Sequence, residues 1–279
     1  MTDEIDRNFV RITEGQVHFR SNGDLGGEER PLVLIHASPA SALTLVPLIK
    51  ELAGSRPLMA PDTLGNGDSC KPQMAVPDIA YYADAVGRTL DVLGIGPIDI
   101  YGSHTGGSIA TELSIRQPER VRHLIIDGIG LYSKELQRDM LENYTPEITP
   151  DAFGAQFHWA WHFVRDQALF FPWYKRDTEH QRTGGLPLPG QLHAMVMEVL
   201  KSIDTYHMGY RASFRYPKRD RLALVGVPTM MIFETSDPLF QYRNEAVALV
   251  REAILGEVSG GPGAMAKAKV INDWLSCQS

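Results

Sequence analysis

Cysteine, positive charge and long apolar runs are all scarce in this chain. Its 279 residues include two cysteines, Cys70 and Cys277, which are too few for a disulfide framework or a zinc site built from cysteine alone. Acidic side chains outnumber basic ones by 34 to 27, so nucleic acid and anionic membranes are poor partners. The longest apolar stretch, residues 222–233, contains a glycine and a proline and is too short to span a bilayer. Residues 1–9 lack the apolar run of a signal peptide, and we expect a cytoplasmic protein.

What is present is an alternation of strand-like and helix-like segments. Several strand-like segments are continuous apolar runs, which are typical of strands buried on both faces of a parallel sheet. Strands are expected at residues 9–12, 16–20, 31–37, 56–62, 97–102, 121–128, 227–234 and 254–258. Helices are expected at residues 41–53, 78–93, 104–117, 245–253 and 264–277. The order predicts an α/β fold with a mostly parallel sheet and helices on both of its faces.

Residues 131–217 break this alternation between two expected sheet strands. They include the aromatic-rich segment FHWAWHFVRDQALFFPWYKR, residues 157–176. We expect a helical cap that covers the carboxyl edge of the sheet, where open α/β sheets bind ligands. The predicted division is therefore a core of residues 1–130 and 218–279 with a cap at 131–217. Aromatic side chains that do not pack the cap would line a site for an apolar or aromatic small molecule.

A tight turn joins the strand at 97–102 to the helix at 104–117. The spacing Gly102-Ser103-His104-Thr105-Gly106 matches the G-x-S-x-G nucleophile elbow except at its centre, which is His104. The elbow forces its central residue into a strained backbone conformation and requires small neighbours. Histidine tolerates a positive φ better than most residues other than glycine, so the substitution is sterically reasonable.

With this turn, the chain resembles the α/β-hydrolase fold superfamily, and three loops extend the resemblance. These are IHASPAS at 35–41, similar to the H-G-x-P loop, DTLGNGDS at 62–69, similar to the D-x-x-G-x-G-x-S loop, and VPTMMIFETSDPL at 227–239, similar to the triad-acid segment. The resemblance implies an α/β-hydrolase fold and an oxyanion hole formed by the backbone N–H groups of Ser38 and Thr105. It also implies a triad acid at Asp237. His36, in the first loop, is expected to be a structural anchor.

The histidine that this superfamily places after the last strand is missing. No histidine follows His207, and residues 257–269, where the resemblance places it, contain none. Because serine is also absent from the elbow centre, an ordinary Ser-His-Asp mechanism does not carry over to this sequence.

Three interpretations of His104 stay open. In the first, His104 and Asp237 form a catalytic dyad, with Asp127 at the end of the strand at 121–128 as a reserve acid. The neutral imidazole would then activate water, attack an acyl group, or take a proton from carbon or oxygen. In the second, catalysis is lost and the pocket binds a ligand. In the third, His104 is structural and the chemistry belongs to the cap.

The cap contains a candidate metal cluster and candidate substrate contacts. His158, His162 and Asp166 are four residues apart, so a helix would place them on one face. The glutamate of H-E-x-x-H is absent, because Trp159 follows His158. We therefore expect no metal, and we expect His158, Trp159, His162 and Trp173 to contact substrate.

The expected function is hydrolysis of an ester, lactone or related acyl bond without a cofactor, and a homodimer is left open. The alternatives are a cofactor-independent lyase, isomerase or oxygenase reaction with His104 as general base, or an inactive ligand-binding protein. Where the cap returns to the core, a basic cluster forms either a solvated surface or a carboxylate site. Its members are Arg211, Arg215, Lys218, Arg219 and Arg221.

Overall fold

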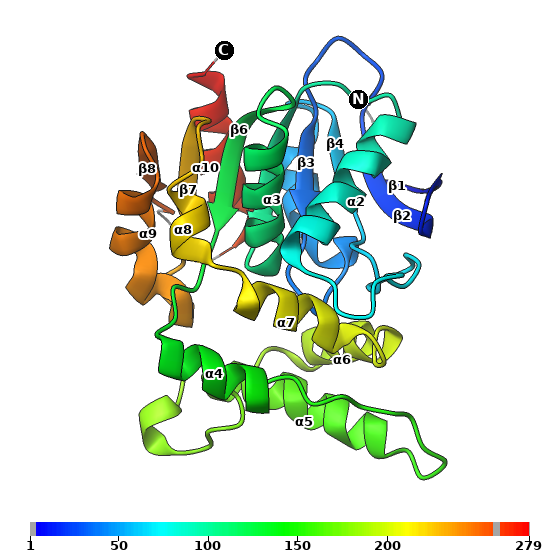
Figure 1. Cartoon of the computed structure of the whole chain (residues 1–279), viewed down its shortest axis with the longest axis vertical. Helices are drawn as coiled ribbons and strands as arrows, with labels where there is room; N and C mark the ends of the chain where they lie inside the picture. Colours follow the sequence, from blue (N-terminus) through cyan, green and yellow to red (C-terminus); the bar gives the residue numbers. More distant parts are fainter. Residues whose placement is uncertain (1–3, 259–262, 279) are drawn as a thin grey trace.

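The computed structural model describes residues 4–258 and 263–278, and in this part eight strands form one sheet. Their order across the sheet is β1-β2-β4-β3-β5-β6-β7-β8 (Figure 1). The strands are β1 Asp6–Ile12, β2 Gly15–Asn22, β3 Leu32–Ile35, β4 Leu58–Pro61, β5 Ile98–Ser103, β6 Val121–Asp127, β7 Thr229–Ile232 and β8 Ala253–Gly256. β1 and β2 pair antiparallel at one edge, β2 is antiparallel to β4, and the pairs from β4 to β8 are parallel. The predicted mostly parallel sheet is confirmed.

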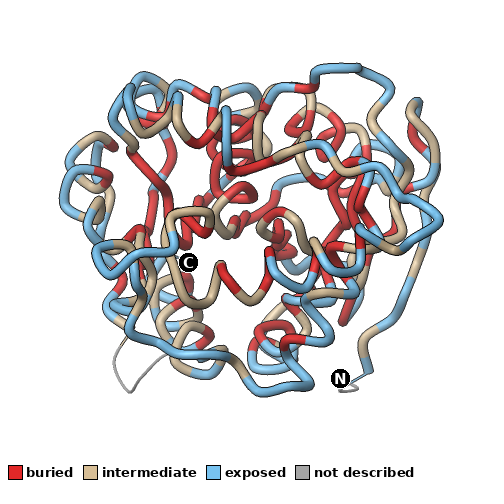
Figure 2. The backbone as a smooth tube through the Cα atoms, turned by 90° about the horizontal axis from the view of Figure 1, so that it is seen from below, coloured by how far each residue is buried: buried red, intermediate tan, exposed pale blue. Residues whose placement is uncertain are grey.

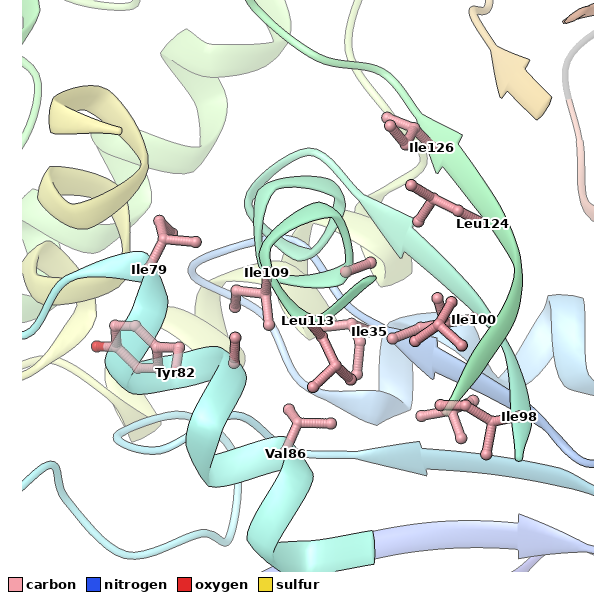
Figure 3. Packing of buried hydrophobic residues seen from close by; sticks show 14 of the residues in the cluster. Ile35, Ile79, Tyr82, Val86, Ile98, Ile100, Ile109, Leu113, Leu124 and Ile126 are labelled. Atoms are coloured by element: carbon pink, nitrogen blue, oxygen red, sulfur yellow. The ribbon is translucent and has the colours of Figure 1, made fainter. Parts of the chain in front are cut away.

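Helices cover both faces of the sheet because side chains alternate along each strand. Val33 and Ile35 point into one hydrophobic cluster, beneath α2 (Ile79–Val92), α3 (Thr105–Arg116) and α9 (Arg243–Leu249). Leu32 and Leu34 point into a second cluster, beneath α1 (Val46–Leu52) and α10 (Ala264–Ser276). Figure 3 shows the first cluster, in which Ile109 and Leu113 of α3 face the isoleucines of the sheet. Figure 2 shows the buried residues inside the molecule and the exposed ones along its outer turns.

The helix expected at residues 245–253 ends earlier in the structure, and the prediction is corrected. α9 ends at Leu249, Val250 is extended, and Glu252 has a φ of 63°. The chain thus turns back so that Ala253 begins β8, which pairs with β7. A strand partner at the edge of the sheet overrides the local helical pattern of these residues.

The cap lies between β6 and β7 and consists of helices (Figure 1). These are α4 Lys134–Asn143, α5 Ala155–Leu169, α6 Pro189–Lys201 and α7 Tyr206–Arg215, and α8 Lys218–Leu222 leads back to the sheet. The cap has a hydrophobic cluster of its own, in which Tyr144, Phe163, Trp173 and Tyr206 are buried. None of the described helices is long and apolar enough to cross a membrane.

Two glycines allow α3 to start directly against the sheet. A Cβ at Gly102 would lie 2.2 Å from the backbone oxygen of Gly106. A Cβ at Gly106 would lie 2.3 Å from the backbone oxygen of Ile35, at the end of β3. Backbone atoms at such distances cannot move aside without displacing the strand or the helix, so the elbow spacing sets how closely α3 approaches β3 and β5.

We expect Gly106→Ala to lower the free energy of unfolding by about 1–3 kcal/mol or more, because overpacking against backbone outweighs the better helix propensity of alanine. Gly96→Ala is the matched control, since nothing lies within 4 Å of a Cβ there. Denaturant unfolding of both variants and the wild type is the measurement. Equal unfolding midpoints for the two variants would contradict the packing argument.

Candidate active site

His104 occupies a strained backbone position between β5 and α3. Its φ is 51° and its ψ is −105°, and its backbone N–H donates to the oxygen of Asp127 at 3.0 Å. Its own oxygen accepts from the N–H of Ser108 at 3.2 Å, in the first turn of α3. These bonds and the two elbow glycines hold the residue in place. Backbone strain that the surrounding structure maintains is a feature of functional sites.

The imidazole of His104 faces the carboxylate of Asp237. Nε2 of His104 lies 2.8 Å from Oδ2 of Asp237, while Oδ1 of Asp237 accepts from the N–H of Leu239 at 2.8 Å. Gly128 makes room for the ring, because a Cβ there would lie 3.1 Å from Nε2 of His104. A carboxylate only accepts hydrogen bonds, so in the neutral ring Nε2 carries the hydrogen and Nδ1 carries the lone pair. Nδ1 has no hydrogen-bond partner among the described residues.

Opposing effects set the pKa of His104. Burial lowers this pKa, but the charge and hydrogen bond of Asp237 raise it, Asp127 adds to the increase, and Lys267 opposes it. The result is a pKa above the usual 6.5. Burial likewise raises the pKa of Asp237, yet His104, the N–H of Leu239 and the nearby Arg182 bring it below the usual 3.8. The pair is thus a coupled dyad in which the carboxylate keeps its charge.

Two backbone N–H groups near His104 are free. Ser38 follows β3, Thr105 is the first residue of α3, and both border the same cavity as His104. Within residues 4–258 and 263–278, neither N–H donates a hydrogen bond to the protein. The N–H of Thr105 is one of the donors that a helix leaves unpaired at its start, where the helix dipole also favours negative charge.

The loop after β3 is anchored by His36, as expected. Nδ1 of His36 donates to the oxygen of Ala37 at 2.7 Å, and Nε2 accepts from the N–H of Thr63 at 2.9 Å. Burial lowers the pKa of His36, which keeps the ring neutral in this role. Both ring nitrogens are used, so His36 is not free for chemistry.

Lys267 is one of two lysines in the segment where the resemblance places the superfamily's histidine. Its Nζ lies 2.5 Å from Oδ2 of Asp127 and 2.7 Å from Oε1 of Glu234. Asp127 also accepts from the hydroxyl of Tyr101. The structure therefore pairs Asp127 with Lys267, and it pairs the imidazole of His104 with Asp237. Sequence reasoning missed Lys267 because nothing in AMAKAK separates it from its exposed neighbour Lys269.

A cavity of about 550 Å³ lies between the carboxyl ends of the strands and the cap. Residues that follow β3, β5, β6 and β7 form its floor, and cap residues form its roof. The aromatic side chains that line it are Tyr101 from β5 and, from the cap, Tyr132, Tyr144, Phe171, Tyr210 and Phe214. Its polar cap residues include Gln167, Arg182 and Glu198. Oε2 of Glu198 is buried without a hydrogen-bond partner.

The four cap residues expected to contact substrate lie outside this cavity, which corrects that expectation. His158 and His162 are exposed on the outer face of α5, while Trp159 stacks on Phe163 with ring centroids 4.7 Å apart. Trp173 is buried in the cap and donates from Nε1 to the oxygen of Tyr144 at 2.9 Å. The sequence pattern showed that α5 is aromatic on several sides, and it did not show which side faces the sheet.

The metal alternative in the cap also fails on geometry. Asp166 is fully buried and pairs with Arg165 and Arg176, whereas His158 and His162 face outward. A residue eight positions further along a helix is rotated by about 80° from the first, so the three do not converge. Among the described residues, one group of potential ligands is close enough to hold an ion, formed by His18, Asp62 and Asp68. Asp62 uses its oxygens to anchor loops, at 2.8 Å from His18 and from the N–H groups of Ala42 and Asp68.

The basic cluster divides into four arginines, of which three form ion pairs, and one buried lysine. Arg211 pairs with Glu147 and Arg219 with Glu245, each at 2.6 Å, Arg221 pairs with Glu112 at 2.9 Å, and Arg215 is exposed. Lys218 instead is buried and borders the cavity. Of the two expectations for the cluster, a solvated surface therefore applies to Arg215 and Arg219, while Arg211 and Arg221 are half-buried in their ion pairs.

Comparison with known proteins identifies the family to which this chain belongs. A family model described as alpha/beta hydrolase fold matches residues 30–252, and the chain belongs to this family. The predicted α/β-hydrolase fold is therefore confirmed.

Particular relatives are known from sequence and from structure. The chain is 38% identical over 112 residues to 2-hydroxymuconate semialdehyde hydrolase from Pseudomonas sp. (strain CF600), and the match covers 39% of this chain and 40% of that protein. It therefore spans less than half of that relative. Two solved structures show the same fold. A hydrolase from Pseudomonas aeruginosa PA01 has a TM-score of 0.73 at 16% identity over 97% of this chain and 98% of that one. The enol-lactonase from Burkholderia xenovorans LB400 has a TM-score of 0.72 at 17% identity over 96% and 100%.

An NMR titration of the imidazole of His104 tests the dyad electrostatics. We expect a pKa above 6.5 in the wild type and below 6.5 in Asp237→Asn, where burial dominates. Because the folded-state pKa of His104 is raised and that of Asp237 is lowered, the pair stabilises the protein fully between about pH 4 and 6.5. This stabilisation is lost as pH rises through the folded-state pKa of His104 or falls through that of Asp237. His104→Ala identifies the resonance. A pKa that does not fall in Asp237→Asn would contradict the assignment.

Proposed function

We propose that this protein is an enzyme that hydrolyses an acyl bond, or a carbon–carbon bond next to a carbonyl, in a small apolar or aromatic molecule. The observation that carries the proposal is the contact of 2.8 Å between Nε2 of His104 and Oδ2 of Asp237, at the elbow and beside two backbone N–H groups that donate to no described residue. The relatives named as hydrolases support the reaction class. No metal or cofactor has a part in this mechanism.

In the proposed mechanism, Nδ1 of His104 is a general base for water. It takes one proton while the water oxygen bonds to the substrate carbonyl carbon, and the carbonyl oxygen becomes an oxyanion. The N–H groups of Ser38 and Thr105 stabilise that anion. Asp237 stabilises the imidazolium, which then returns the proton to the leaving oxygen or carbon as the bond breaks. The protein is unchanged at the end of the cycle.

The aromatic lining of the cavity supports an apolar or aromatic substrate. Tyr132, Tyr144 and Phe171 come from different parts of the cap and border the same space as His104. The proposal treats residues 131–217 as a cap on a core of residues 1–130 and 218–279. The separate hydrophobic cluster of the cap supports this division.

A second function rests on the same geometry, with His104 as general base in a cofactor-independent lyase, isomerase or oxygenase reaction. The observation that favours it is the unpartnered Nδ1, because proton removal from carbon needs one base and donors for the resulting enolate. The same dyad and free donors count against an inactive binding protein.

Replacing His104 with alanine is expected to lower kcat/KM for aromatic esters by about 10²–10⁴-fold, the usual contribution of a general base. His158→Ala is the matched control, because this histidine is exposed and lies outside the cavity. The measurement is turnover of a panel of phenyl and naphthyl esters. Undiminished turnover by His104→Ala would sink the hydrolytic proposal.

The two candidate acids should differ in their effect on turnover. Asp237→Asn is expected to lower kcat by about 10²-fold or more, because the imidazolium loses its counter-charge. Asp127→Asn should cost less than about tenfold, because Asp127 pairs with Lys267. Thermal unfolding of both variants shows whether either loss arises from unfolding. The opposite order of the two kcat values would exchange the roles of these carboxylates.

A further inference from the structure

Among the described residues, three cations border the cavity, and two of them already have partners: Lys267 and Arg182. Lys267 lies between the carboxylates of Asp127 and Glu234, at 2.5 and 2.7 Å. Arg182 donates to the backbone oxygens of Gln167 at 2.7 Å and Ser236 at 3.2 Å. The third cation, Lys218, lacks partners among the described residues for most of its N–H donors.

Lys218 is buried without a counter-charge. The residue is 7% exposed, and no carboxylate of the described residues lies within 4 Å of its Nζ. The ammonium donates to the oxygen of Ser213 and lies 5.8 Å from the ring centroid of Tyr132. One backbone acceptor leaves two N–H donors of the ammonium without a protein acceptor. Burial lowers the pKa of Lys218 to about 7, which reflects the cost of an unpaired charge at this place.

A structural role as the cap of a helix terminus is the competing explanation. Ser213 is in the last turn of α7, where a cation interacts favourably with the free carbonyl groups. Such a lysine needs no cavity beside it, and at the surface water would satisfy its other donors. Lys218 instead borders the space that contains His104, among Tyr132, Ser213 and Phe214.

We propose that Lys218 binds a carboxylate of the substrate, so that the cavity accepts an aromatic or apolar acid whose scissile bond lies at His104. A carboxylate supplies the missing counter-charge and accepts the unused N–H donors. Glu198 borders the cavity too, and no cation of residues 4–258 and 263–278 lies within 4 Å of its carboxylate. Its negative charge would repel a substrate carboxylate, so the charges favour the orientation in which the anion lies at Lys218.

This inference rests on the proposal that the cavity is the substrate site, and binding tests it without turnover. The probes are 3-phenylpropanoate and 5-phenylpentanoate, each compared with its neutral amide, in calorimetric titrations of the full chain. We expect the carboxylates to bind at least tenfold more tightly than the amides. Lys218→Met should abolish this preference. Arg215→Met, which removes an exposed charge nearby, should keep it.

Thermal unfolding separates substrate binding from helix capping. If Lys218 serves the substrate, Lys218→Met removes an unpaired buried charge, and the Tm should stay the same or rise. If Lys218 caps α7, the Tm falls and the preference for carboxylates does not change. Equal affinity for acids and amides, a preference that survives Lys218→Met, or no binding of either pair would overturn the inference. A carboxylate preference together with no ester turnover would overturn the hydrolytic proposal alone.

Discussion

The close approach of α3 to the ends of β3 and β5 is the constraint on which the site depends. Gly102 and Gly106 permit this approach, since a Cβ at either would lie within 2.3 Å of a backbone oxygen. The approach fixes His104 at a positive φ and directs its ring away from the sheet. It also leaves the N–H of Thr105 free beside the loop that contains Ser38. His104 and the N–H groups of Thr105 and Ser38, proposed as the base and donors, thus depend on one backbone arrangement.

The sequence was sufficient for the fold and for the contact between His104 and Asp237. Continuous apolar runs located the buried strands, and the spacing of Gly102 and Gly106 located the elbow. The pairing of His104 with Asp237 could be anticipated because both follow parallel strands, β5 and β7, at the carboxyl ends of the sheet, with β6 between them. By contrast, the end of α9 depended on pairing between β7 and β8, which the local pattern of residues 245–253 does not contain.

The cap was the part that sequence reasoning could not resolve. In α5, apolar and aromatic residues occur on several sides, so the helix has no clear amphipathic phase that would show which side faces the sheet. Trp159 and Trp173 therefore looked like substrate contacts, although they pack within the cap. Lys218 looked like part of a surface run of arginines, because only the tertiary structure shows that the chain turns inward there. Whether a single charged residue is buried depends on the tertiary fold, not on the residues beside it in the sequence.

Both anion-stabilising donors proposed for this site, at Ser38 and Thr105, are peptide N–H groups. Exchange of a side chain cannot remove such a donor, and only proline lacks it. The side chain at position 104 can therefore be replaced while the backbone donors stay in place. A different side chain at position 104 would meet the same two donors and the same carboxylate across the cavity. A single substitution at position 104 would change the chemistry of this site, provided that a neighbouring glycine such as Gly128 leaves room for the new side chain. The backbone that receives the negative charge would not need to change.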